Sequence, residues 1–190
     1  MRLRLSPFVA CVLLASPVLA QQGQYGAAVE WRSQIGSTSE TSDRRSGLAL
    51  RLMGTWVLRP GTDGRVEGAW SQMQYDRRDE FGAIPITESG LEVGGLLRQG
   101  LGALGSVRPY ALLGAIASLR MSCGVDSAFD LGSVVACEGS DQFLLGWGAG
   151  LGARREFIGG WDWFLEARVL GNVTSAGGGR LIAIGVGAAF

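Results

Sequence analysis

Eight stretches of this chain alternate between bulky apolar residues and small or polar residues, and this pattern limits the fold more than any other feature. In the closing stretch, 180–190, one face carries the bulky residues and the other is mostly small: Ile182, Ile184, Val186 and Ala188 against Leu181, Ala183, Gly185, Gly187 and Ala189. A period of two is that of a β-strand. A strand of this kind suits a barrel wall, with lipid outside and a crowded lumen inside.

The alternation predicts strands over 24–35, 46–58, 65–75, 88–99, 107–121, 141–154, 161–173 and 180–190. Short turns at 59–64, 100–106 and 155–160 broadly alternate with loops at 36–45, 76–86 and 122–140, and only the last connection, 174–179, departs from this order. Short turns at one end and longer loops at the other are typical of membrane barrels. The charges lie on the face opposite the apolar one, which is the inverse of a soluble barrel. We therefore predict an all-β fold, an eight-stranded antiparallel up-and-down transmembrane β-barrel.

Aromatic residues at the predicted strand ends agree with this fold. They adjoin the short turns at Trp56, Trp161, Trp163 and Phe190, with Tyr75 and Phe143 near the other rim. Membrane barrels carry girdles of aromatic residues at both interfaces.

The first twenty residues have the pattern of a secretory signal peptide. Arg2 and Arg4 precede an apolar run from 8 to 15, and Val18-Leu19-Ala20 forms a small-x-small cleavage pattern before Gln21. The run is too short for a membrane helix, and the part of it before Cys11 is too short for a lipoprotein signal. We expect a signal peptide at 1–20 that is cleaved on export and a barrel domain at 21–190.

The charged residues exclude several kinds of chemistry. The chain has no Lys and no His, which removes a Ser-His pair, a Lys Schiff base, a phosphate-loop Lys and His metal ligands. Loss of Arg2 and Arg4 leaves 15 arginines against 17 acids, a net charge of about −2 by that subtraction, so nucleic acid is not an expected partner. We expect no cofactor, no metal site and no catalytic residue.

Ten charged residues are predicted to face the lumen: Glu30, Arg32, Arg51, Glu67, Glu92, Arg98, Arg108, Arg154, Glu166 and Arg168. An eight-stranded barrel is just wide enough for side chains to fill it, so opposite charges there would be close enough to pair. One interpretation is an internal ion-pair network that plugs the lumen. The other is a narrow polar conduit for small solutes.

Three further patterns in the sequence bear on possible chemistry. Cys123 and Cys137, the only cysteines after residue 20, lie in one predicted loop and favour a disulfide over a two-thiolate metal site or a redox pair. Paired carboxylates, Asp79-Glu80 and Glu88 with Glu92, are interpreted as solvated loop charges. The glycines at 146, 148, 150 and 152 have a period of two, which keeps them on one strand face, whereas a phosphate loop turns into a helix.

The closing strand that ends on Phe190, together with the eight alternating segments, resembles small bacterial outer-membrane β-barrels of the OmpA and OmpX type. The resemblance implies insertion into the outer membrane, with Phe190 as part of the signal read by the barrel-insertion machinery. It also implies contact with outer-membrane lipid and periplasmic chaperones, and we expect a monomer. Members of this group act as structural anchors or as adhesion and immune-evasion surfaces. The barrel enzymes among them rely on a His that this chain lacks.

The resulting hypothesis is a non-enzymatic outer-membrane protein that supports the envelope or presents external loops to a surface partner, which the sequence does not identify. Two alternatives remain: a soluble periplasmic barrel that binds an apolar ligand, and a narrow outer-membrane channel.

Overall fold

The structure is a computed structural model that describes residues 23–35, 45–79, 82–125, 143–157, 160–173 and 180–190. Its eight strands are β1 (Gly23–Ile35), β2 (Ser46–Arg59), β3 (Thr62–Asp79), β4 (Gly82–Gly100), β5 (Val107–Val125), β6 (Phe143–Glu156), β7 (Asp162–Asn172) and β8 (Arg180–Ala189). Residues 1–20, predicted as a signal peptide, lie outside the described ranges. Those ranges contain no helix that is long and apolar enough to cross a membrane.

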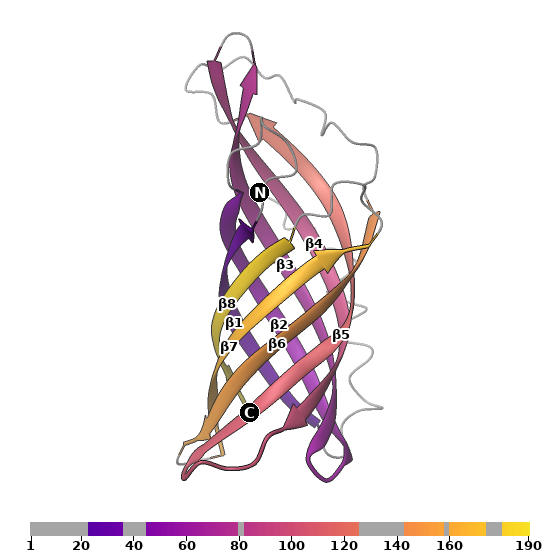
Figure 1. Cartoon of the computed structure of the whole chain (residues 1–190), viewed down its shortest axis with the longest axis vertical. Helices are drawn as coiled ribbons and strands as arrows, with labels where there is room; N and C mark the ends of the chain where they lie inside the picture. The colour runs from indigo at the N-terminus through magenta and orange to yellow at the C-terminus, as the bar shows by residue number, and fades with distance from the viewer. Residues whose placement is uncertain (1–22, 36–44, 80–81, 126–142, 158–159, 174–179) are drawn as a thin grey trace, which may run out of the picture.

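The strands form one closed barrel in chain order, and each strand is antiparallel to its neighbours (Figure 1). The closure is made between the first and last strands, where β1 pairs with β8 from Gly26 and Ala189 to Ile35 and Arg180. The backbone of Phe190 continues this closure, because its N–H donates to the carbonyl of Tyr25 at 2.8 Å and its carbonyl accepts from the N–H of Tyr25 at 2.9 Å. The predicted closed, up-and-down topology is thus confirmed.

Large apolar side chains cover the outside of the barrel. On β2, Leu48, Leu50 and Leu52 are 55–61% exposed, whereas the intervening Ala49 and Arg51 are each 1% exposed. The same alternation runs along β1 and β7. This arrangement, with the bulky apolar groups outside and the charged groups inside, argues against a soluble barrel that carries an apolar ligand in its interior.

The lumen is not exclusively polar. Apolar side chains from β4 to β7 pack inside the barrel and form part of its core: Leu96, Leu112, Ile116, Leu144, Phe164 and Leu170. The arginines and glutamates at the centre of the lumen come mainly from β1, β2, β3 and β7. The lumen therefore contains apolar clusters beside the ionic groups.

The prediction of a loop over 76–86 was wrong. Strands β3 and β4 remain paired to Asp79 and Gly82, leaving only residues 80 and 81 between them. Strand β5 likewise continues to Val125, beyond the predicted loop start at 122. Outside a bilayer a strand needs no apolar face, so the alternation fades while the backbone pairing continues. Pro85 lies opposite Asp76 of β3 and one residue beyond the last β4–β5 pair, Ile86–Val125, near the start of β4, where a proline is tolerated.

Candidate functional site

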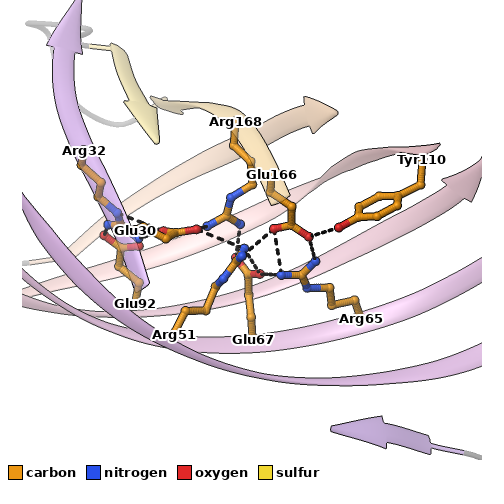
Figure 2. Close-up of polar contacts among 9 residues, drawn as sticks. All are labelled: Glu30, Arg32, Arg51, Arg65, Glu67, Glu92, Tyr110, Glu166 and Arg168. Atoms are coloured by element: carbon orange, nitrogen blue, oxygen red, sulfur yellow. Dashed lines mark hydrogen bonds and ion pairs between the residues drawn. The ribbon is translucent and has the colours of Figure 1, made fainter. Parts of the chain in front are cut away.

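The candidate site is a network of charged side chains at the centre of the lumen (Figure 2). The strand alternation that turns leucines outward also turns these residues inward, where all but Glu92, whose side chain is 15% exposed, are almost completely buried. The network contains four arginines and four glutamates, which balance in charge: Arg32, Arg51, Arg65 and Arg168 with Glu30, Glu67, Glu92 and Glu166. We refer to these eight residues as the lumenal network.

Glu166 on β7 joins strands from opposite sides of the barrel. Its carboxylate lies 2.5 Å from Nη2 of Arg51 on β2 and 2.5 Å from Nη1 of Arg65 on β3. It also accepts a hydrogen bond of 2.6 Å from the hydroxyl of Tyr110 on β5. One carboxylate therefore connects four strands.

The other glutamates are equally well paired. Glu67 lies 3.1 Å from Arg51, 3.1 Å from Arg65 and 2.5 Å from Arg168. Glu30 accepts from Arg168 at 2.6 Å, and from Arg32 at 3.0 Å.

Glu92 extends the network toward the long-loop end, where it lies 2.5 Å from Nη1 of Arg32. Buried charges are tolerated when each is paired and hydrogen-bonded, and removal of one partner from such a pair typically costs ~3–5 kcal/mol.

Two glycines on β6 make room for this network. A Cβ at Gly152 would lie 2.6 Å from the hydroxyl oxygen of Tyr110, and one at Gly150 would lie 2.7 Å from Cγ of Arg168. Both contacts are too close for a side chain at those positions. Gly150 and Gly152 therefore give space to neighbouring large side chains.

Seven of the ten residues predicted to face the lumen are in the lumenal network. The other three, Arg98, Arg108 and Arg154, lie nearer the short-turn end. There Arg98 donates to Asp63 at 2.6 and 2.8 Å, Arg154 lies 3.6 Å from Asp162, and Arg108 forms an exposed pair with Glu156 at 3.2 Å.

Sequence reasoning missed Arg65 and Tyr110 as members of the site. Arg65 lies two residues before Glu67 on the same strand, so strand alternation alone could have added it. The contact of Tyr110 with Glu166 joins β5 to β7 across β6, and no sequence spacing signals it.

A smaller ionic cluster lies nearer the long-loop end. Glu88 is 2.9 Å from Nε of Arg120 and 3.5 Å from Arg45, and the guanidinium of Arg45 lies 4.3 Å from the ring centroid of Tyr75. Of the predicted cysteine pair, the backbone of Cys123 lies in β5 opposite Glu88, and Cys137 lies outside the described residues. In the described part of the chain, no three potential metal ligands among Cys, Asp and Glu gather as a metal site would require.

The topology, the apolar exterior and the charged lumen define the class: the chain has the fold of the small eight-stranded β-barrels of the bacterial outer membrane. Solved structures with this fold include Neisserial surface protein A, which is 16% identical over 88% of this chain and 95% of its own, with a TM-score of 0.53. OprG from Pseudomonas aeruginosa is 13% identical over 89% of this chain and 96% of its own, with a TM-score of 0.51. No protein-family model matches the sequence, and no curated protein sequence matches it. The similarity to the solved structures therefore concerns the fold.

Proposed function

We propose that this chain is a non-enzymatic protein of the bacterial outer membrane, in which a sealed barrel anchors a surface-exposed β-ribbon for contact with a partner outside the cell. In this proposal residues 1–20 direct export and are removed, and residues 21–190 form the barrel. Three features support it: the apolar exterior, the balanced charges of the lumenal network, and the unequal lengths of the strands.

The unequal strand lengths carry the proposal. A strand needs about 9–11 residues to cross a bilayer, and β7 and β8 have 11 and 10. Strands β3, β4 and β5 have 18, 19 and 19 residues. Beyond the ends of β2 and β6 the three long strands continue over residues 75–79 of β3, 82–89 of β4 and 120–125 of β5. We call this extension the outer ribbon, and its five to eight residues per strand correspond to roughly 16–26 Å.

The outer ribbon lies at the end of the barrel opposite the short turns. Strand β2 begins at Ser46, opposite Gln74, so β3 continues beyond β2; β6 begins at Phe143, opposite Leu119, so β5 continues beyond β6. Figure 1 shows the β3–β4 hairpin rising above the other strands. Short turns face the periplasm in outer-membrane barrels, so the outer ribbon would face the cell exterior.

The lumenal network favours a sealed barrel over a narrow channel. Arginines and glutamates from β1, β2, β3 and β7 meet across the lumen at 2.5–3.2 Å, which leaves no separation at that level for a hydrated ion. The protein should therefore show no discrete conductance in planar bilayers. Stepwise currents from the purified, folded protein would support the channel alternative instead.

Two sequence-based expectations belong to this proposal. A Cys123–Cys137 disulfide would connect the described end of β5 to the segment that follows it, and a link of this size typically stabilises a protein by roughly 3 kcal/mol. Thiol labelling of the denatured protein with and without reductant tests it. Phe190, 57% exposed and 5.2 Å from the ring centroid of Trp161, would be read by the insertion machinery as part of the closing strand.

The direct test is the location of the outer ribbon in intact cells. A short epitope inserted between Asp79 and Gly82, at the β3–β4 tip, should bind antibody on intact cells. The same epitope inserted after Pro60, in the β2–β3 turn, serves as the matched control and should bind only after permeabilisation. Labelling of the Pro60 insertion alone on intact cells would show that the orientation is reversed, and labelling of neither would contradict surface exposure.

A further inference from the structure

The mouth of the barrel at the short-turn end contains two arginines that face each other without an intervening acid. In the β5–β6 register Arg108 is the direct partner of Arg154, and both residues follow the inward alternation of their strands. Like charges directly opposite each other across a strand pair are destabilising. Each arginine of the lumenal network has a glutamate oxygen at 2.5 Å, and among the residues that the structure describes the opposed pair has no acid so close.

Neither arginine is firmly bound to an acid of the chain. The contacts that the described residues offer Arg154 are long, 3.6 Å to Asp162 and 3.4 Å to the amide oxygen of Gln24. Arg108 pairs with Glu156 at 3.2 Å, but the two side chains are 54% and 60% exposed. Exposed pairs of this kind hold their partners weakly. Both guanidiniums therefore retain hydrogen-bond donors for another ligand.

Both arginines line a cavity of about 380 Å³. Arg98 also lines it, and the only carboxylate in the lining, Asp63, already accepts two hydrogen bonds from Arg98. The lining also includes Gly100, Gly102 and Ala103, which have little or no side chain to fill the space. The cavity is thus lined by three cationic side chains and by one carboxylate that is already paired with Arg98.

The cavity lies at the level expected for lipid headgroups, where phosphate groups are abundant. Arg155, the neighbour of Arg154, pairs across the β6–β7 register with Trp163, and Trp161, Trp163 and Phe190 are all exposed at this end of the barrel. Exposed aromatic residues of this kind mark the level of lipid headgroups. Arginine is well suited to phosphate because its planar fork donates two parallel hydrogen bonds.

We propose that this mouth is a phosphate-binding site, in which Arg108 and Arg154 together hold one phosphate group and Arg98 lines the cavity beside it. The phosphate would belong either to a phospholipid headgroup of the inner leaflet or to a soluble phosphate of the periplasm. This site is independent of the outer ribbon and of any surface partner.

Binding can be measured calorimetrically on the folded protein in maltoside micelles, which contain no phosphate, at low salt. The probes are inorganic phosphate and glycerophosphoglycerol, the diester headgroup of phosphatidylglycerol. Arg108→Gln and Arg154→Gln should each weaken binding by about tenfold or more, because each removes charged hydrogen bonds. Arg155→Gln is the matched control, since this neighbouring arginine is exposed on the outer face, and it should bind as the wild type does.

Thermal unfolding gives a second, independent measurement. Without phosphate, Arg154→Gln should unfold no earlier than the wild type, because the substitution relieves the repulsion from Arg108. Phosphate should raise the unfolding midpoint of the wild type and leave that of the double variant, Arg108→Gln with Arg154→Gln, unchanged. Tighter binding of the diester would assign the site to lipid, and tighter binding of inorganic phosphate would assign it to soluble phosphate. Absence of saturable binding of both probes, or equal binding by the double variant, would overturn the proposal.

Discussion

Arg51 and Glu166 meet across the lumen, with Nη2 of Arg51 2.5 Å from Oε2 of Glu166. They lie on β2 and β7, which are not neighbours in the sheet and share no backbone pairing. The contact therefore ties opposite walls of the barrel together through side chains alone. Several ion pairs of this kind hold the cross-section in place, in addition to the hydrogen bonds of the closed sheet.

Arg51→Met and Glu166→Gln should each be strongly destabilising. Either change removes one charge from a balanced buried network and leaves one charge uncompensated, and breaking a buried ion pair in this way typically costs ~3–5 kcal/mol in the free energy of unfolding. The free energy of unfolding of the double variant should fall by clearly less than the sum of the two single losses, because the two charges removed are opposite. The two single variants and the double variant form a double-mutant cycle. Their free energies of unfolding can be measured by urea unfolding in micelles, with the heat-dependent gel mobility of the folded barrel as the readout. The exposed pair Arg108–Glu156 is the control, with an expected coupling energy of about 0–1 kcal/mol. Equal coupling energies for the two pairs would show that the buried position of the lumenal network adds nothing to the stability of the barrel.

Gly152→Ala should destabilise the barrel by about 1–3 kcal/mol, the usual cost of overpacking. The added methyl group would meet the ring of Tyr110 and push its hydroxyl away from Glu166. Gly95→Ala is the matched control, because no atom lies within 4 Å of the position of its Cβ. Comparison of the two free energies of unfolding tests whether the glycines of β6 leave necessary space for neighbouring side chains. An unchanged free energy of unfolding for Gly152→Ala would refute this role.

Leu50→Arg should cost more than Leu58→Arg. Both side chains are exposed on the outer face of β2, at 55% and 52%, but Leu58 lies past Trp56 at the short-turn end. Arginine on the lipid face costs ~2–4 kcal/mol at the bilayer midplane and ~0–1 kcal/mol near the interfaces. Unfolding measured in phospholipid vesicles should show this difference. Equal effects at the two positions would be inconsistent with a membrane-crossing β2.

Phe190→Ser should lower the amount of folded protein in the outer-membrane fraction, if the closing strand is read as we propose. Phe157→Ser is the control, since Phe157 is also exposed at the short-turn end, at 62%, but lies outside the strands. Quantitative immunoblotting of the heat-modifiable band gives the yield. An unchanged yield for Phe190→Ser would remove Phe190 from the insertion signal.

The sequence predicted the barrel, and which side chains face outward or into the lumen, because a bilayer imposes a period of two on every strand that crosses it. Leu48, Leu50 and Leu52 could be placed outside, and Arg51 inside, from alternation alone. The same reasoning failed at 76–86, where the strands leave the apolar environment and the periodicity that marks them is lost. Contacts such as Tyr110–Glu166 and Arg51–Glu166 depend on how far each strand is staggered around the barrel, and a single strand's sequence does not record that stagger.

The orientation of the side chains is the central claim, and native tryptophans report on it most directly. Trp31 and Trp70 are 48% and 43% exposed near the middle of β1 and β3, and Trp161 and Trp163 are exposed at the short-turn end. Single-tryptophan variants, reconstituted in vesicles whose acyl chains carry bromine at defined depths, should divide into two groups. Trp31 and Trp70 should be quenched best by deep bromines, and Trp161 and Trp163 by shallow ones. If Trp31 and Trp70 are not quenched at any depth, they do not face lipid, and the proposed orientation of this barrel is wrong.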